Sequence, residues 1–216
     1  MSKTKKHAFQ KILMHILNVY TAIGILLVTI ATVLFITPAL PYLWYRFNDD
    51  ATNQEVEHIA SPTHENSSAN SNPVPETSLP PFDETLPTTN ILSIPSIGVY
   101  GEIHEGSIAK SALEKGVWRV DTFGTPEDSA SMILASHRFG YLTWSSSFRT
   151  ANSFFNLPKT KVGDTVEIIW NQRSYTYRIY KTEDTTAIDD YSADLILYTC
   201  RLFNSPVRVF RYAERE

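Results

Sequence analysis

The sequence of 216 residues predicts an all-β domain carried behind a single N-terminal transmembrane helix. Three features indicate this: an uncharged apolar stretch near the start, a polar segment rich in proline, and a series of short segments rich in β-branched and aromatic residues. We expect three regions, namely a cytoplasmic tip and anchor at 1–48, a disordered linker at 49–90 and a folded domain at 91–216. The length suits one ordinary domain with additions.

The N-terminal region has the features of a membrane anchor. No Asp, Glu, Lys or Arg occurs from Ile12 to Tyr45, and Ile16–Ile36 is dense in Leu, Ile, Val and Ala. Such a stretch is long enough to cross the hydrocarbon core of a bilayer as a helix. Four lysines and no acid precede it, so the positive-inside rule places the N-terminus in the cytoplasm and the later residues outside. The alternative is a cleaved signal peptide, whose apolar core would be shorter.

The segment 49–90 has the composition of a chain that does not fold alone. Ser, Thr, Asn, Pro and Glu dominate it, and six prolines between Pro62 and Pro87 prevent regular helix. We therefore expect a tether that holds the folded domain away from the membrane. The folded domain itself carries fourteen basic and fifteen acidic side chains, and this near-neutral balance gives no basis for binding nucleic acid.

From Ile91 onward the pattern is one of short β segments separated by Gly, Pro, Asn and Asp. About eight short strands in a domain of this size predict a closed barrel or a sandwich. Two short helices are expected, at Ser111–Lys115 and Ser147–Asn156. The strands that the pattern delimits are Ile91–Ile94, Val99–Ile103, Ser131–Ser136, Thr165–Trp170, Ser174–Lys181, Leu195–Thr199 and Val207–Tyr212.

Cys200 is the only cysteine, and it is a candidate nucleophile. Outside the cell a lone thiol is either buried and inert or has a chemical function. The presence of a single cysteine leaves both possibilities open. Of the six histidines only His104 and His137 lie in the folded domain. His137 follows one expected strand and Cys200 ends another, so each lies beside a loop, where reactive groups are commonly placed.

A cysteine at the end of a strand needs nearby cations to stabilise its thiolate. A protonated histidine and an arginine can do this, and the arginine can also stabilise the oxyanion formed when a carbonyl is attacked. Three arginines follow the cysteine: Arg201, Arg208 and Arg211. Arg208 and Arg211 are three residues apart on a strand and therefore face opposite ways, so only one of them can share the face of Cys200.

Several short segments of the folded domain resemble motifs of the sortase family. The segment Leu195–Cys200 is similar to the sortase signature Thr-Leu-x-Thr-Cys, with Ile196 in place of the first Thr. Ala135-Ser136-His137-Arg138 resembles the histidine strand, which usually reads Gly-His, so Ser136 is a departure. Further similarities, in the order of the family, are Ile94-Pro95-Ser96-Ile97-Gly98-Val99, Glu105-Gly106, Phe155-Asn156-Leu157 and Gly163-Asp164.

The resemblance implies a sortase-type β-barrel and a cysteine transpeptidase that uses Cys200, His137 and Arg208. It implies as partners secreted proteins with a C-terminal sorting signal like Leu-Pro-x-Thr-Gly, and an amine acceptor from a cell-wall precursor or from a protein lysine. No second apolar span follows the barrel, which favours a class other than the pilin-polymerising sortases. No cofactor is implied, although some sortases use calcium, for which the sequence indicates no site.

Two alternatives remain at this stage. One is an L,D-transpeptidase-like wall enzyme, although its Ser-His-Gly-Cys arrangement is absent because Tyr198-Thr199 precede Cys200. The other is a non-catalytic membrane-tethered β-domain for adhesion or scaffolding. The expected linker also contains Leu86-Pro87-Thr88-Thr89-Asn90, which has the form of a Leu-Pro-x-Thr signal. Either this is a coincidence in a segment rich in Pro and Thr, or the stretch acts as a pseudo-substrate.

Overall fold

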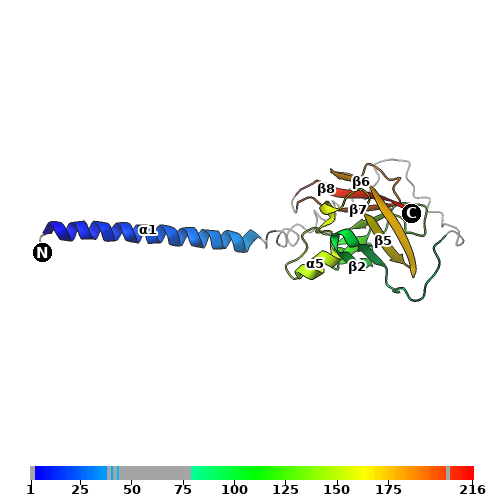
Figure 1. Ribbon diagram of the computed structural model, residues 1–216, viewed down its shortest axis with the longest axis horizontal. Coiled ribbons are helices and arrows are strands. Elements are labelled where there is room, and N and C mark those ends of the chain that lie inside the picture. The colour runs from blue at the N-terminus through cyan, green and yellow to red at the C-terminus, as the bar shows by residue number, and fades with distance from the viewer. Residues whose placement is uncertain (1–2, 38–39, 41–42, 44–78, 203–204) are drawn as a thin grey trace. The chain divides into compact units, whose positions relative to one another are not determined.

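The computed structural model describes residues 3–37, 40, 43, 79–202 and 205–216 (Figure 1). It divides into two compact units, Met1–Leu40 and Pro41–Glu216. Most of the expected linker, residues 49–78, lies outside the described residues. The limits proposed for the three regions therefore remain predictions.

The first unit contains one long helix, α1 (Lys3–Ile36). Within it, Ile12–Ile36 is long and apolar enough to cross a membrane. Four threonine hydroxyls donate to main-chain carbonyl oxygens four residues earlier, at 2.7–2.9 Å, so these polar groups are satisfied inside the helix. The helix therefore has the length, composition and internal hydrogen bonding that a membrane span requires.

The second unit is a closed barrel of eight strands in the order β1-β2-β3-β4-β7-β8-β6-β5, as the sequence predicts. Two of the neighbouring pairs, β2–β3 and β4–β7, are parallel, and the others are antiparallel. The strands are β1 (Ile91–Ile94), β2 (Val99–His104), β3 (Val117–Arg119), β4 (Met132–Ala135), β5 (Thr165–Trp170), β6 (Arg173–Thr185), β7 (Leu195–Cys200) and β8 (Arg208–Arg215). The short helices are η3 (Pro95–Ile97), α4 (Ala109–Leu113), α5 (Ser146–Asn152) and η4 (Leu157–Lys159).

Alternation along the strands builds two apolar clusters. The first draws residues from all eight strands, including Leu195 and Leu197, and fills the barrel. The second contains Ile196 and Tyr198 and lies on the outer face of β3, β4, β7 and β8, where α4 and residues between β6 and β7 cover it. β7 is therefore buried on both faces, and its even-numbered residues point outward from the barrel.

The seven strands delimited from the sequence are present, most with ends shifted by a few residues. The strand that the pattern misses is β3, which has only three residues. The hairpin between β5 and β6 turns on Asn171 and Gln172, whose φ angles of 49° and 58° are those of a type I′ turn. Helix α5 ends four residues earlier than expected.

The hydrogen bonding of the barrel begins before Ile91. Residues 80–90 run past the β5–β6 hairpin and are held there mainly through their main-chain atoms. The contacts are Asp83 N–H to the Gln172 carbonyl (2.9 Å), Gln172 Nε2 to the carbonyls of Glu84 and Leu86 (3.2 Å each), Asn171 N–H to Asn90 Oδ1 (3.1 Å), Ile103 N–H to the Asn90 carbonyl (2.8 Å) and Arg173 Nη1 to the Pro80 carbonyl.

Candidate active site

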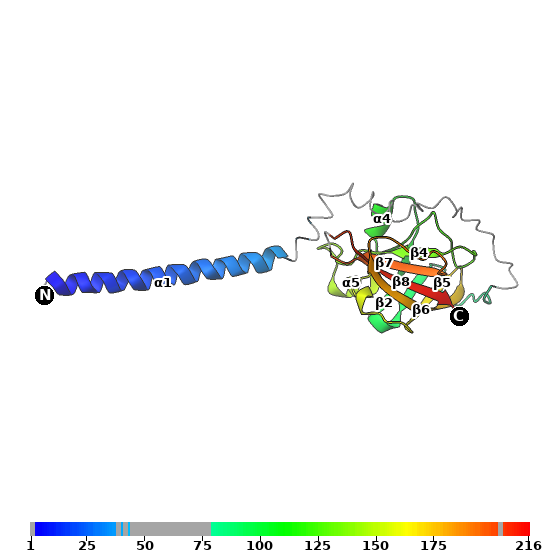
Figure 2. The same cartoon turned by 90° about the horizontal axis from the view of Figure 1, so that it is seen from above.

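Two parallel strands place His137 and Cys200 at the same end of the barrel. Figure 2 shows β4, β7 and β8 side by side, and Ala135 on β4 is in register with Tyr198 on β7. The Ser136 N–H continues the ladder by donating to the Tyr198 carbonyl at 3.4 Å. Because both chains run in the same direction, this register continued by two residues beyond the last ladder pair sets His137 beside Cys200.

Cys200 and Arg208 are direct partners across the antiparallel strands β7 and β8. Side chains opposite each other in such a pair have Cβ atoms about 5 Å apart and lie on one face. Arg208 is 4% exposed, and its Nη1 donates to the carbonyls of Ser205 and Val207. Burial raises the pKa of the Tyr198 phenol, the charge of Arg208 opposes this shift and Cys200 adds to it, so Arg208 and Cys200 both act on the same neighbouring ring.

Arg211 points to the opposite face of β8. Its Nε donates to Thr160 Oγ1 at 2.7 Å, and its Nη1 lies 4.0 Å from Asp184 Oδ1. Burial lowers the pKa of the Arg211 guanidinium, and Asp184 opposes this shift. The structure therefore brings Arg208, and not Arg211, next to Cys200. The spacing predicts that only one of the two arginines shares this face, and the family resemblance selected Arg208.

His137 is buried, with 4% of its surface exposed. Burial lowers the pKa of its imidazole to about 4, so the ring is neutral at physiological pH. The hydroxyl of Tyr141 lies 3.3 Å from Nε2, and the Tyr141 ring meets the imidazole edge-on at a centroid distance of 5.4 Å. The His137 carbonyl accepts from the N–H of Phe154 at 3.2 Å, which fixes the chain directly after β4.

Arg138 is a further candidate residue of the site, and it was not predicted from the sequence. Its Nη1 donates to the carbonyl of Arg201, the residue after Cys200, and its guanidinium stacks over the Phe139 ring at 5.2 Å. Burial and Arg201 lower the Arg138 pKa, whereas Asp184 and Cys200 raise it. Its position directly after the candidate histidine was the available signal. The thiol therefore has cationic groups both across the sheet and on the loop after β4.

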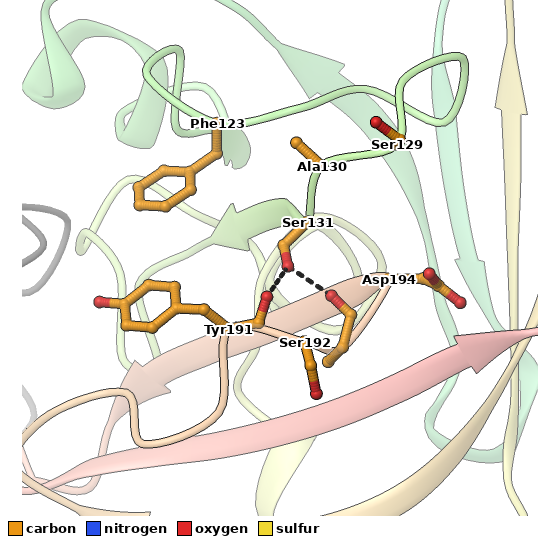
Figure 3. A pocket seen from close by; sticks show the side chains of 8 residues that line it. Phe123, Ser129, Ala130, Ser131, Tyr191, Ser192 and Asp194 are labelled. Atoms are coloured by element: carbon orange, nitrogen blue, oxygen red, sulfur yellow. Dashed lines mark hydrogen bonds between the residues drawn. The ribbon is translucent and has the colours of Figure 1, made fainter. Parts of the chain in front are cut away.

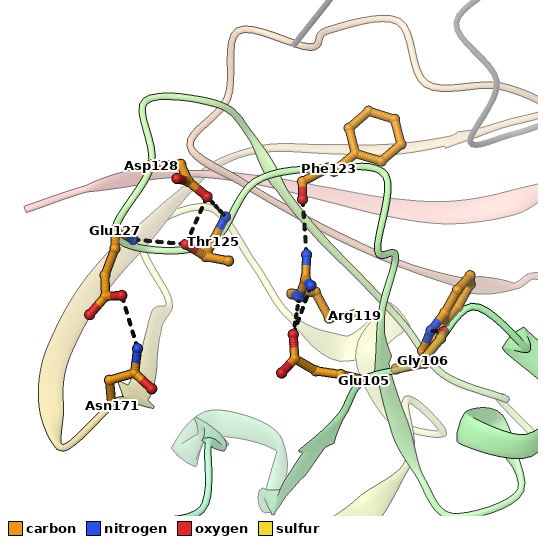
Figure 4. A network of polar contacts seen from close by, with 9 residues as sticks. Glu105, Gly106, Arg119, Phe123, Thr125, Glu127, Asp128 and Asn171 are labelled. Atoms are coloured by element: carbon orange, nitrogen blue, oxygen red, sulfur yellow. Dashed lines mark hydrogen bonds and ion pairs between the residues drawn. The ribbon is translucent and has the colours of Figure 1, made fainter. Parts of the chain in front are cut away.

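The Glu105-Gly106 pair joins the end of β2 to the β3–β4 connection (Figure 4). Arg119 Nη2 lies 2.7 Å from Glu105 Oε1, and its Nη1 donates to the Phe123 carbonyl at 2.9 Å. Trp118 Nε1 donates to the Gly106 carbonyl at 2.9 Å. Glu105 and Gly106 therefore have a structural role, because these contacts hold the loops at the edge of the second apolar cluster.

A pocket of about 190 Å³ lies between the β3–β4 and β6–β7 connections (Figure 3). Phe123 and Tyr191 stack across it with ring centroids 5.9 Å apart, and the Ser131 hydroxyl donates to the Tyr191 and Ala193 carbonyls at 2.6 and 2.5 Å. The pocket is at the start of β7, whereas Cys200 is at its end, roughly 17 Å away at the rise of a strand. It contains none of the three predicted site residues.

His104, the other histidine of the folded domain, lies at the end of β2 with Nδ1 3.8 Å from Glu102 Oε1. Among the residues that the structure describes, no group of three or more His, Cys, Asp or Glu side chains could hold a metal ion.

The fold and the site together define a barrel with a thiol, an imidazole and a guanidinium at the ends of three adjoining strands. A model of the sortase domain matches residues 92–216, which is more than half of the chain. The chain belongs to the sortase family and is a transpeptidase of the sortase type. This membership decides against the L,D-transpeptidase and the non-catalytic alternatives.

Solved sortases are similar to this chain in fold. Sortase C of Streptococcus pneumoniae has 20% identity and a TM-score of 0.50, covering 59% of this chain and 68% of that one. Sortase C1 of Streptococcus agalactiae has 24% identity and a TM-score of 0.48, covering 63% and 70%. The sortase D5 transpeptidase of Clostridium perfringens has 20% identity and a TM-score of 0.48, covering 60% and 79%. A search of curated proteins returned no match.

Proposed function

We propose that this chain cleaves a Leu-Pro-x-Thr-like sorting signal at the C-terminal end of secreted proteins. It then joins the new carboxyl end to an amine, either from a cell-wall precursor or from a protein lysine. The observation that carries the proposal is the direct pairing of Cys200 with Arg208. It is supported by the position of His137, two residues after β4, the strand that lies parallel to β7. These three residues are the proposed catalytic groups.

In the first half of the proposed reaction, neutral His137 accepts the thiol proton as the Cys200 sulfur attacks the threonine carbonyl carbon. The Arg208 guanidinium donates hydrogen bonds to the oxyanion that forms. The carbon–nitrogen bond then breaks, and His137 returns its proton to the leaving amine. Because burial keeps His137 neutral at rest, this proton comes from Cys200 and not from solvent.

In the second half, the acceptor amine attacks the thioester carbonyl and gives a proton to His137. The carbon–sulfur bond breaks, a new amide is released, and Cys200 regains its proton from His137. The same oxyanion forms again, so Arg208 acts in both halves. The identity of the amine decides whether the product is attached to the wall or to another protein.

We further propose that α1 anchors the chain in the plasma membrane, with the N-terminus in the cytoplasm and the barrel outside. The length and composition of Ile12–Ile36 support the anchor. The lysines before the span and the acidic residues after it support the orientation. An extracellular barrel would meet secreted substrates and wall precursors on the same side of the membrane.

Mass spectrometry of the intact full-length chain in detergent micelles tests the reaction. The chain is incubated with sorting-signal peptides that vary at each position, first alone and then with amine acceptors. We expect a covalent adduct on Cys200 with the mass of the peptide up to its threonine, and transfer of that fragment when an acceptor is added. A folded chain that forms no adduct with any peptide would overturn the proposal.

A further inference from the structure

The loop between β4 and α5 covers His137. Tyr141, in the middle of this loop, presents the edge of its ring to the imidazole at an interplanar angle of 80° and brings its hydroxyl to 3.3 Å from Nε2. Trp144 packs on Tyr141 with ring centroids 5.4 Å apart, and Phe148 on α5 packs on Trp144 at 5.0 Å. A row of three aromatic rings thus connects α5 to the histidine.

The loop has a defined conformation because α5 holds its main chain. Arg149 donates from Nε to the Phe139 carbonyl at 2.8 Å, and from Nη2 to the Tyr141 and Trp144 carbonyls at 3.3 and 3.4 Å. Gly140 has a φ of +66°, and a Cβ there would lie 2.1 Å from the Trp144 ring, so only glycine fits. Tyr141 is therefore placed by the fold.

The contact at Nε2 constrains the proton chemistry of His137. A neutral imidazole can donate or accept at Nε2, but an imidazolium can only donate, because both of its nitrogens carry hydrogen. A hydroxyl that accepts a hydrogen bond from Nε2–H can keep this bond whether the imidazole is neutral or protonated. A hydroxyl that donates to Nε2 would have to change from donor to acceptor each time the imidazole is protonated. If the Tyr141 hydroxyl accepts from Nε2–H throughout the reaction, the other ring nitrogen, Nδ1, is the atom that gains and loses the proton.

We propose that Tyr141 is a positioning residue that accepts a hydrogen bond from His137 Nε2 and thereby makes Nδ1 the proton-transfer atom. The inference rests on the proposed function, in which His137 carries the proton between thiol and amine. Tyr141 itself exchanges no proton with the substrate. It acts by fixing the tautomer and the orientation of the ring, as the partners of functional histidines commonly do.

Nitrogen NMR of the full-length chain in detergent micelles, labelled with ¹⁵N at histidine, tests this assignment. His137 resonances are identified by their loss in His137→Gln. At neutral pH we expect Nε2 to carry the hydrogen and Nδ1 to be bare. In Tyr141→Phe the ring is kept but Nε2–H loses its partner, so both nitrogen shifts should move towards a mixture of tautomers. Turnover number should fall about tenfold with little change in KM.

Tyr180→Phe is the matched control, because it removes a part-buried hydroxyl that donates to Asp190 Oδ2 at 2.8 Å on another element. It should leave the His137 nitrogen shifts unchanged. A wild-type chain with hydrogen on Nδ1 and a bare Nε2 would overturn the assignment, as would Tyr141→Phe with unaltered His137 shifts. A wild-type chain that turns over no peptide would count against the proposed function, and the nitrogen shifts would still decide the tautomer.

Discussion

The hydroxyl of Thr199 donates a buried hydrogen bond of 2.7 Å to the main-chain carbonyl of Ser136. The two residues are 63 positions apart, and each directly precedes a proposed catalytic residue, Cys200 and His137 respectively. The Ser136 hydroxyl in turn donates to the Gly116 carbonyl at 2.9 Å, just before β3. Position 136 thus ties the histidine strand to its neighbours on both sides, through the serine hydroxyl towards β3 and through the main-chain carbonyl towards β7.

Removing the Thr199 hydroxyl should impair both stability and turnover. Thr199→Val keeps the shape but leaves the buried Ser136 carbonyl without this donor, which should lower the free energy of unfolding by about 1–3 kcal/mol. We also expect turnover at saturating peptide to fall, because His137 follows Ser136 directly. Chemical denaturation and peptide turnover measure the two effects. Thr199→Ser, which keeps the hydroxyl, is the control, and a fully active Thr199→Val would show that the bond does not position the site.

Cys200→Ala should abolish transpeptidation and leave the barrel folded. The side chain is small and only partly buried, so its loss removes little packing, whereas the proposed nucleophile is gone. Intact-protein mass spectrometry should find no peptide adduct, and circular dichroism should match that of the wild type. Product formed by a folded Cys200→Ala chain at the wild-type rate would require a different nucleophile.

Replacing the two buried arginines by lysine should separate catalysis from stability. Arg208→Lys should lower turnover by orders of magnitude, because a lysine lacks the paired donors of a guanidinium. Arg211→Lys should mainly lower the unfolding midpoint, since Arg211 faces away from Cys200 and bonds Thr160. Turnover per folded molecule and thermal unfolding are measured for both. If Arg211→Lys is the variant that loses turnover, the roles assigned to the two faces of β8 are reversed.

Much of this site could be predicted from sequence, because the informative residues are local to strand ends. The rule that residues three apart on a strand face opposite ways showed that only one of Arg208 and Arg211 can share the face of Cys200, and the family resemblance selected Arg208. The strand β3 was missed because three residues give too little alternation to recognise. The contact of Tyr141 with His137 could not be foreseen, since it depends on how α5 and Arg149 fold the loop back.

The segment before the barrel shows a second limit of sequence reasoning. Its composition is typical of a disordered chain. Nevertheless, residues 80–90 are bonded to the hairpin through main-chain carbonyls and N–H groups, which every sequence possesses. Composition reports how much apolar surface a segment can bury, and it does not report whether a neighbouring side chain such as Gln172 will hold its backbone.

Acid should destabilise the fold through His137. Burial lowers its pKa from 6.5 to about 4, so between these values the unfolded chain binds more protons than the native one. The free energy of unfolding should therefore be highest above the unfolded pKa and fall as the pH drops through this window, by at most roughly 3 kcal/mol. Chemical denaturation across the window measures the slope. His137→Gln, which does not titrate, should flatten it, and an unchanged slope in this variant would assign the effect to other groups.

The last prediction concerns the Leu86-Pro87-Thr88-Thr89-Asn90 stretch. Its Leu86 carbonyl accepts from Gln172 at the hairpin, next to the start of β6, whereas Arg208 pairs with Thr185 at the end of that thirteen-residue strand. The two ends are roughly 40 Å apart along the strand, so the stretch is held away from the site of its own molecule. Inhibition of a neighbouring molecule remains a hypothesis, and it would require the stretch to leave the hairpin.

We expect Pro87→Ala to leave peptide turnover unchanged at low and high densities of the full-length chain in vesicles. The reason is that the hydrogen bonds to the hairpin compete with entry into any groove, although neighbours on a membrane have a high effective concentration. Pro81→Ala, an exposed proline of the same segment, is the matched control. Turnover that rises in Pro87→Ala alone, and only at high density, would instead identify the stretch as a pseudo-substrate acting between molecules.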